Sequence, residues 1–294
     1  MFEKVLVPID FSKNAKRVVE CVGDIPGVKE VVLLNVVARD PLARVWDPVA
    51  EAKDAEKRLM EEKSAVKVPG ISVKVKAVSA LEGDVASAIQ MVAEDEKVSL
   101  VAMGARGKSR LQSALLGSTS RDVLRFGDTH LLVMRYKTVE GDKAVEGGVM
   151  EKFCVRVFAK VLFPTDFSQP SEAALSFLKG MSGIGELILL NVVSKTETDE
   201  EIDVYVADAT SKINEIAKNL GQGGMKVTPK VVVGHPVEVI HSEAEKEDVS
   251  LIALSSKGAV AIKRGMIGST AYDVANRSRR PVLILRSKKA MYYV

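Results

Sequence analysis

Short apolar runs alternate along this chain with segments in which apolar residues recur every three or four positions. Residues 4–9 form a continuous apolar run that ends at Asp10, which is typical of a strand buried on both faces. Ser12 is a good helix N-cap, and residues 13–23 carry apolar side chains at helical spacing. The chain is therefore expected to begin with a strand followed by a helix.

The same alternation continues as far as Arg135. Further strands are expected at 30–37, 72–78, 99–103 and 130–135, and further helices at 50–66, 84–94 and 118–125. Strands that alternate with helices predict an α/β fold in which a mostly parallel sheet is covered by helices on both faces. Ligands of such sheets bind at the carboxyl ends of the strands.

The chain then repeats itself. Residues 4–12 read KVLVPIDFS and residues 160–168 read KVLFPTDFS, an offset of 156 that the second strand pattern, VVLLNVV against LILLNVV, preserves. From Gly83, which corresponds to Gly234, the offset is 151. The pattern indicates a duplication in which the second copy lacks five residues, expected in the loop or helix after the second strand.

A length of 294 residues suits two domains. The first is expected at 1–137 and the second at 158–294, each with a five-stranded sheet, and a glycine-rich, acidic linker at 138–157.

Charge and hydropathy exclude several classes of protein. The net charge is only +3, with basic and acidic residues interspersed, so neither nucleic acid nor an anionic membrane is an expected partner. No run of apolar residues is long enough to span a membrane, and the N-terminus lacks the pattern of a signal peptide, so a cytoplasmic location is expected. Cys21 and Cys154 have no metal-binding spacing and are expected to be unpaired thiols.

A glycine motif follows the fourth expected strand. The chain reads Gly104-Ala-Arg-Gly107, then nine residues, then Gly117-Ser118-Thr119. Glycines allow a ligand to approach the backbone closely, and the unpaired N–H groups at a helix N-terminus attract anions. A strand that leads through glycines into a helix is therefore suited to phosphate. Lys108 and Arg110 could add charge or be solvated loop residues.

These residues resemble the universal stress protein family. Its nucleotide-binding members carry G-x-x-G, nine residues and G-[ST], as the glycine motif does here. Their first strand ends in a V-P-x-D-x-S segment, matched by residues 7–12, and their second in a pair matched by Asn35 and Val36. The resemblance covers both copies and leaves out only the linker. It implies a Rossmann-like fold, similar to that of adenine nucleotide α-hydrolases.

The resemblance also implies roles for single residues. Asp10 would hydrogen-bond the ribose or adenosine, the Val36 backbone would contact adenine, and Gly104 would pack near the ribose. The phosphates would be held by Gly107, Gly117, Ser118 and Thr119. The ligand would be ATP, with Mg²⁺ or Mn²⁺ accompanying the triphosphate.

The second copy departs from the pattern at one position. Ser255 replaces the first glycine, and its side chain would crowd the ribose, or distort the loop if a positive φ is required there. The rest of the pattern survives at Asp166, Val192, Gly258, Gly268, Ser269 and Thr270. The first site is expected to bind ATP well, and the second to bind it more weakly or to bind another molecule.

The sequence favours binding over catalysis. It contains no G-x-x-x-x-G-K-[ST] loop and no arrangement of a nucleophile with a base. An ATP-binding stress-response or regulatory protein is the favoured interpretation. A slow ATPase and a tandem interaction module that holds a different small molecule, or none, are the alternatives. Trp46 is either a lid over the first site or a surface residue of a variable segment.

Family members with a single domain typically pair through their last strand. By analogy, the two copies are expected to form a pseudo-symmetric dimer within one chain through residues 130–135 and 281–286. Pairing would cover strand edges that otherwise favour aggregation. Two chains could form a further homodimer.

Overall fold

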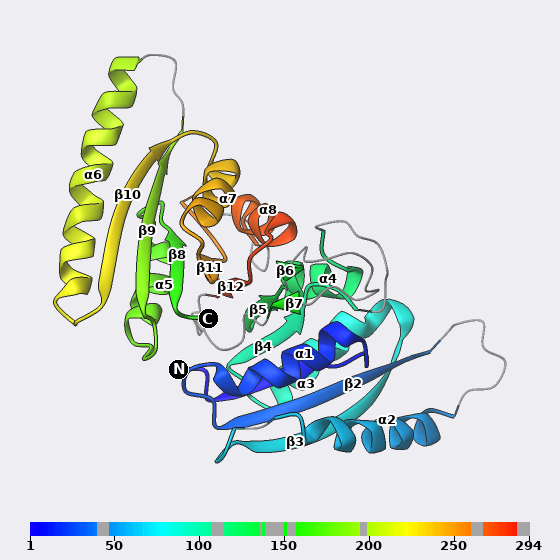
Figure 1. Cartoon of the computed structure of the whole chain (residues 1–294). Coiled ribbons are helices and arrows are strands. Elements are labelled where there is room, and N and C mark those ends of the chain that lie inside the picture. Colours follow the sequence, from blue (N-terminus) through cyan, green and yellow to red (C-terminus); the bar gives the residue numbers. More distant parts are fainter. Residues whose placement is uncertain are drawn as a thin grey trace, which may run out of the picture. The chain divides into compact units, whose positions relative to one another are not determined.

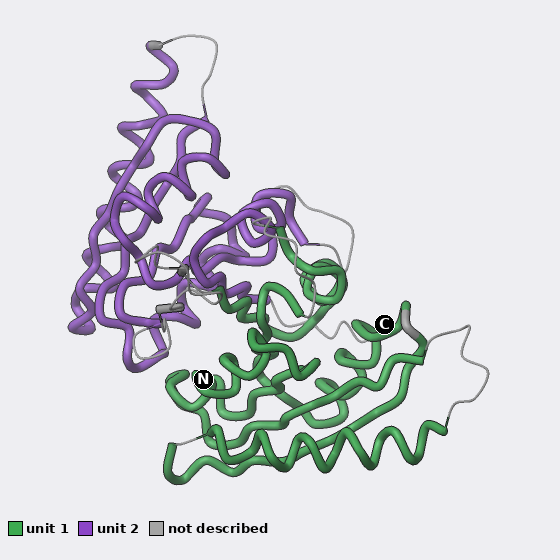
Figure 2. Tube along the Cα trace, turned by 45° about the vertical axis from the view of Figure 1, so that its right-hand side comes forward, with its two compact units in different colours: residues 1–155 green, residues 156–294 purple. Residues whose placement is uncertain are grey.

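The computed structural model describes residues 1–39, 47–66, 68–107, 115–135, 137–138, 150–151, 157–194, 199–259 and 267–286. The chain divides into two compact units, residues 1–155 and 156–294, which have separate colours in Figure 2. Each unit contains one copy of the repeat.

Unit 1 alternates strands and helices as the apolar pattern predicts. Its elements are β1 (Lys4–Pro8), α1 (Lys13–Cys21), η1 (Val22–Asp24), β2 (Glu30–Arg39), α2 (Pro48–Lys63), β3 (Ser72–Leu81), η2 (Glu82–Asp84), α3 (Val85–Asp95), β4 (Leu100–Gly104), α4 (Ser118–Phe126), β5 (His130–Met134) and the antiparallel pair β6 (Lys137–Thr138) and β7 (Met150–Glu151). The first five strands are parallel, in the order β3-β2-β1-β4-β5.

The strand order places the helices on two faces. The chain moves outward from β1 to β3 and then crosses to the other side of β1 to form β4. Right-handed crossovers therefore place α1 and α2 on one face and α3 and α4 on the other, and each of these helix pairs is in contact. In Figure 1, α2 lies along β2 and β3. The reversal between β1 and β4 is where such sheets bind ligands.

Unit 2 repeats this arrangement. Its elements are β8 (Lys160–Pro164), α5 (Gln169–Lys179), β9 (Glu186–Val193), α6 (Asp199–Gly221), β10 (Lys226–Val233), α7 (Pro236–Lys246), β11 (Leu251–Ser255), α8 (Ser269–Arg277) and β12 (Val282–Leu285). The strands are parallel, in the order β10-β9-β8-β11-β12. The predicted α/β fold class is thus confirmed for both copies.

The central strands are buried on both faces. In β1, Val5, Leu6 and Val7 are fully buried, as are the three corresponding residues of β8. Burial of one such side chain stabilises the fold by about 1.5–3 kcal/mol. Aliphatic residues form most of both cores, which agrees with the low aromatic content of the chain.

The strand registers show where the two copies differ in length. Glu30 of β2 pairs with Ser72 of β3, and Glu186 of β9 pairs with Lys226 of β10. The offset is therefore 154 at the third strand of each sheet, and it falls to 151 only at Gly83. Two of the five missing residues lie between the second and third strands, as predicted. The other three lie at the carboxyl end of the third strand, where β3 extends two residues further than β10, and directly after it.

A carboxylate joins the amino ends of the strands in each unit. Glu96 accepts hydrogen bonds from Lys74 at 2.6 Å and from Lys4 at 3.0 Å. Its counterpart Glu247 bonds Lys230 and Lys160 in the same way. The hydrogen bond from Lys74, and then that from Lys4, lowers the pKa of Glu96 to about 2.

This glutamate makes the stability of unit 1 depend on pH. The folded-state pKa lies below the ordinary glutamate value of 4.5. The stabilisation is therefore complete above pH 4.5 and is lost as pH falls toward 2. We expect Glu96→Gln to flatten this part of the stability profile, measured by urea unfolding between pH 6 and pH 2.5. Parallel profiles for variant and wild type would contradict this role of Glu96.

Cys21, at the end of α1, is buried and disulfide-bonded. The expectation of an unpaired thiol is therefore wrong for this residue. Cys154 lies outside the described residues.

Candidate functional site

The corner after β1 fixes the position of Asp10. Phe11 adopts a left-handed backbone conformation with φ 61°, which turns the chain sharply toward α1. Ser12 caps α1 by accepting a hydrogen bond from the Ala15 N–H, and its own N–H donates to Asp10 Oδ1 at 3.0 Å. Asn35 Nδ2 donates to the Ile9 carbonyl at 2.6 Å, which ties the ends of β1 and β2 together. The Asp10 carboxylate is thus held at the carboxyl edge of the sheet.

Gly107 packs directly against that carboxylate. A Cβ atom added to Gly107 would overlap Asp10 Oδ2. The same restriction applies in unit 2, where a Cβ on Gly258 would lie 2.6 Å from Asp166 Oδ2. Glycine is therefore required here because a carboxylate approaches the backbone closely.

Backbone and side-chain hydrogen bonds fix the rest of the glycine motif. Ser120 Oγ donates to the Gly104 carbonyl at 3.0 Å, and the Gly117 N–H donates to the Ala105 carbonyl at 2.9 Å. Arg106 Nε donates to the Leu115 carbonyl at 3.0 Å. These bonds hold the N-terminus of α4 beside the end of β4. The predicted loop cations Lys108 and Arg110 lie outside the described residues.

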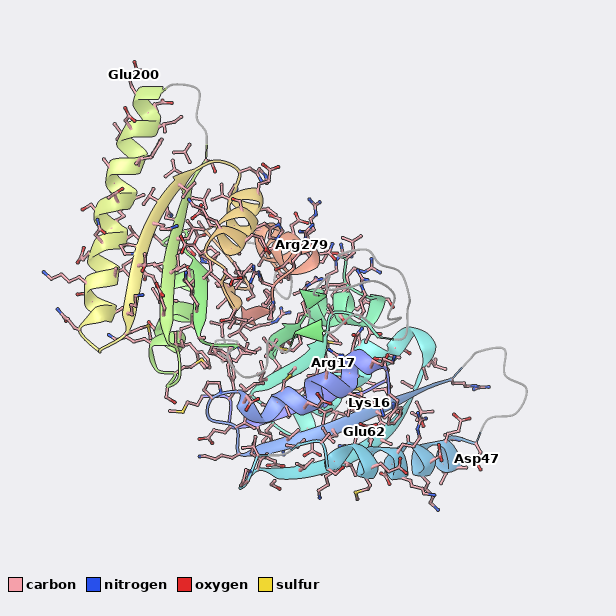
Figure 3. The ribbon with its side chains drawn as sticks, in the orientation of Figure 1. Lys16, Arg17, Asp47, Glu62, Glu200 and Arg279 are labelled. Carbon is pink, nitrogen blue, oxygen red and sulfur yellow. The ribbon has the colours of Figure 1, made fainter. Side chains whose placement is uncertain are left out.

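Helix α2 forms the opposite wall of the site. Asp47 caps its N-terminus, and its two buried residues are Ala55 and Leu59. Lys16 of α1 forms an ion pair with Glu62 of α2, and Figure 3 shows these two side chains together. Helix α2 is thus attached to the sheet by a short apolar contact and to α1 by this ion pair.

These elements enclose one large cavity of about 860 Å³ at the carboxyl edge of unit 1. This volume is in the range of small-molecule and cofactor sites. The side chains around it are mixed. Strand β2 contributes mainly apolar residues, whereas the corner after β1, helix α2 and the glycine motif contribute charged and polar groups. All seven residues predicted for the first site line it, namely Asp10, Val36, Gly104, Gly107, Gly117, Ser118 and Thr119. Trp46, for which a lid over the site and a surface position were both considered, lies outside the described residues.

Charge is distributed unevenly around the cavity. Arg106 lies at the glycine-motif end, close to Arg135, which follows β5. Burial, with a further contribution from Arg106, lowers the pKa of Arg135 to about 10. Glu51 and Asp54 lie at the α2 end. The glycine-motif end therefore favours an anion, and the α2 end does not.

Phe11, Arg58 and Arg106 line the cavity with polar or aromatic groups that were not predicted as site residues. The guanidinium carbon of Arg58 lies 3.8 Å from the centre of the Phe11 ring. Arg106 lies inside the glycine motif, so its position in the sequence could have identified it as a site residue. Arg58 lies on a polar helix that matches no motif.

The residues predicted for the second site also lie at the carboxyl edge of their sheet. Val192 is on β9, Ser255 ends β11, and Gly268 caps the N-terminus of α8, which begins with Ser269 and Thr270. Neither Gly104 nor Ser255 adopts a positive φ, so of the two effects considered for Ser255 the distortion of the loop does not apply, and crowding of the ribose stays a prediction.

Asp166 accepts hydrogen bonds from its own chain at both carboxylate oxygens. Its Oδ1 accepts from the Ser168 hydroxyl at 2.5 Å and from the Ser168 N–H at 3.1 Å. Its Oδ2 accepts from the Ala259 N–H at 2.7 Å. These bonds occupy both carboxylate oxygens.

Two apolar residues that line the first cavity are hydroxyl residues in the second copy. Thr165 stands where the first copy has Ile9, and Ser171 where it has Ala15. The Ser171 hydroxyl donates to Thr165 Oγ1 at 3.0 Å. The second site is therefore more polar at these positions.

The comparison with known families agrees with this geometry. The model of the universal stress protein family matches residues 1–135 and 158–286. The chain belongs to the universal stress protein family. A universal stress protein of Methanocaldococcus jannaschii is 30% identical over 159 residues, which cover 46% of this chain and 98% of that protein. Membership supports a role in the stress response.

Solved structures show that this member carries the family fold twice. The crystal structure of a universal stress protein from Archaeoglobus fulgidus matches 96% of both chains, with 25% identity and a TM-score of 0.69. A functionally unknown protein of Pseudomonas aeruginosa, 17% identical with a TM-score of 0.65, covers 98% of this chain and is covered to 93%, and it shows the fold alone. Within the described residues, no helix of this universal stress protein is long and apolar enough to cross a membrane.

Proposed function

We propose that this universal stress protein binds an adenine nucleotide, ATP above all, in the cavity of unit 1. The nucleoside end lies between β2 and α2, with Asp10 on the ribose and the Val36 backbone on adenine. The phosphates lie against Gly107 and the N-terminus of α4. The assignment combines the family motif with the way the cavity is built.

Gly117 carries the proposal. Its φ of −65° is one that any residue adopts, and a Cβ there would come no closer than 3.7 Å to atoms of the residues that the structure describes. The fold therefore does not require glycine at this position. Gly117 lines the cavity at the N-terminus of α4, where N–H groups attract anions. A ligand phosphate close to the backbone gives a reason for glycine that the protein alone does not.

The second site belongs to the same proposal as a variant. Gly268 has the same ordinary conformation as Gly117, with φ −64°, so the phosphate end is preserved. The ribose end differs, because Asp166 Oδ1 also accepts from the Ser168 hydroxyl and because Ser255 replaces the first glycine. Weaker nucleotide binding, or binding of a different small molecule, follows for unit 2.

A divalent cation would be held mainly by the nucleotide. In the described parts of the chain, no group of three or more His, Cys, Asp or Glu side chains could hold a metal ion. An accompanying Mg²⁺ or Mn²⁺ would thus be coordinated by phosphate oxygens and water.

The architecture completes the proposal. The domains span 1–137 and 158–294, joined by a linker at 138–157. They pair through their fifth strands as a pseudo-dimer, and two chains can associate further as a homodimer. Nucleotide binding then regulates the conformation or the partner of a stress-response protein.

Calorimetry with ATP and Mg²⁺ tests the first site. We expect one ATP per chain for wild type. Gly117→Ala should lower the affinity about tenfold or more, because the Cβ displaces a phosphate from charge-assisted hydrogen bonds, while its thermal stability stays unchanged. Gly268→Ala, the matched control, should leave this binding intact. Absence of binding to ATP, ADP and AMP in the wild type would overturn the proposal, and two ATP per chain would show that unit 2 tolerates Ser255.

A further inference from the structure

Helices α2 and α6 carry the same buried pair. Ala55 and Leu59 of α2 correspond to Ala209 and Ile213 of α6, again at an offset of 154, and all four are at most 5% exposed. The two helices can therefore be compared position by position. The match also places the two-residue length difference before α2.

The comparison identifies one cation that behaves differently in the two units. Arg58 corresponds to Lys212, and each follows an aspartate by four residues, Asp54 and Asp208. Lys212 forms an ion pair with Asp208 at 2.6 Å and lies 5.9 Å from the Phe167 ring. Arg58 forms no ion pair or hydrogen bond with Asp54, or with any other residue that the structure describes, and instead covers Phe11 at 3.8 Å.

Arg58 is held at the cavity with its hydrogen-bond donors available. Contact with an aromatic face stabilises the position of a guanidinium and leaves the N–H groups at its edge free to bind a ligand. Both Arg58 and Phe11 line the cavity. Lys212, in contrast, is neutralised by its own helix.

The surrounding charges decide which part of a ligand Arg58 meets. Glu51 and Asp54 line the cavity from the same helix, and two carboxylates repel phosphate. Arg106 lies at the other end, on the glycine motif. Helix α2 packs on β2, whose Val36 and Val37 also line the cavity.

We infer that Arg58 is a specificity-determining residue of the first site, which donates hydrogen bonds to the uncharged nucleoside end of the ligand. The inference rests on the proposed nucleotide function. Asp10 and Arg58 then hold the nucleoside from two elements, and unit 2 lacks the second of these contacts because Lys212 pairs with Asp208. The difference between Arg58 and Lys212 thus distinguishes the ligand binding of the two sites as much as Ser255 does.

Calorimetry with adenosine, AMP, ADP and ATP tests the inference on wild type, Arg58→Ala and Arg58→Met. Loss of the hydrogen bonds from this charged donor should lower the affinity for each ligand roughly tenfold. The factor should be the same for all four ligands. Lys57→Ala removes an exposed charge from the same helix and Lys212→Ala the corresponding cation of unit 2, and neither should change affinity.

The outcomes separate this inference from the proposed function. A loss that grows with the number of phosphates would overturn the inference, since Arg58 would then contact phosphate. An unchanged affinity in both Arg58 variants would overturn it as well, with the nucleotide site intact. Failure of the wild type to bind any of the four ligands would overturn the proposed function and the inference together.

Discussion

Gly107→Ala should lower the affinity for ATP about a hundredfold, the largest effect expected from one added methyl group. The new Cβ overlaps Asp10 Oδ2, so either the carboxylate or the loop must move. Such overpacking costs about 1–3 kcal/mol, and a displaced Asp10 loses its hydrogen bond to the ligand as well. Isothermal calorimetry gives the affinity, and urea unfolding gives the cost to stability.

Gly258→Ala is the matched control for this variant. Its Cβ would meet Asp166 Oδ2 at 2.6 Å, so a similar loss of stability is expected in unit 2, without a change at the first site. Gly83→Ala adds a methyl group where no atom lies within 4 Å and should change neither quantity. Equal loss of ATP binding in the Gly107 and Gly258 variants would contradict the assignment of the ligand to unit 1.

Leu59→Ala should weaken both unit 1 and its site. Leu59 is fully buried, and Ala55 is the only other buried residue of α2. The cavity left behind should destabilise the unit by about 2–5 kcal/mol. A less firmly attached α2 also carries Arg58 away from the ligand, so ATP affinity should fall about tenfold.

Ile213→Ala provides the comparison in unit 2. The residue occupies the corresponding position on α6 and is 1% exposed, so its loss should destabilise unit 2 by a similar amount and leave ATP affinity unchanged. Hydrogen exchange separates the two units, because each amide reports on its own local stability. If Leu59→Ala retained full ATP affinity, α2 would not form a wall of the site.

The sequence was sufficient for the parallel strands, the duplication and the glycine motif, but not for the short antiparallel pair β6 and β7. The apolar runs at β1 and β4 are buried on both faces, and a run of that kind has few alternatives in an alternating α/β pattern. The sequence alone predicted that Asp10, Gly107 and Gly117 lie close together. Asp10 and Gly107 come shortly after a strand, Gly117 comes just before a helix, and parallel strands end at one edge of the sheet.

The α2 wall could not be predicted in the same way. Arg58 lies among many charged residues of a polar helix, and nothing in the local pattern separates it from Lys57 or Lys63. Its role follows from the rotation of the helix about Leu59 and from the left-handed turn at Phe11, which places the ring beneath it. Both depend on tertiary packing.

The glycines of the motif differ in their surroundings. Gly104 has an ordinary φ, and a Cβ added to it would lie 3.2 Å from the Arg106 carbonyl oxygen. The closer contact occurs at Gly107, where an added Cβ would overlap Asp10 Oδ2. A sequence motif marks the glycines without indicating which of them is required by the backbone and which by a neighbouring group.

The length differences between the copies all fall at the carboxyl ends of the strands. Two residues are lost between β2 and α2, and three at the end of β3 and directly after it. Both places lie at the carboxyl ends of strands. The connections at the amino ends keep their lengths, down to paired left-handed glycines such as Gly70 and Gly224, with φ 85° and 84°. The duplicated chain thus consists of two similar scaffolds that differ in the loops at the carboxyl ends of their strands. Changes in the length of these loops can alter what each unit recognises, while the connections at the amino ends stay the same.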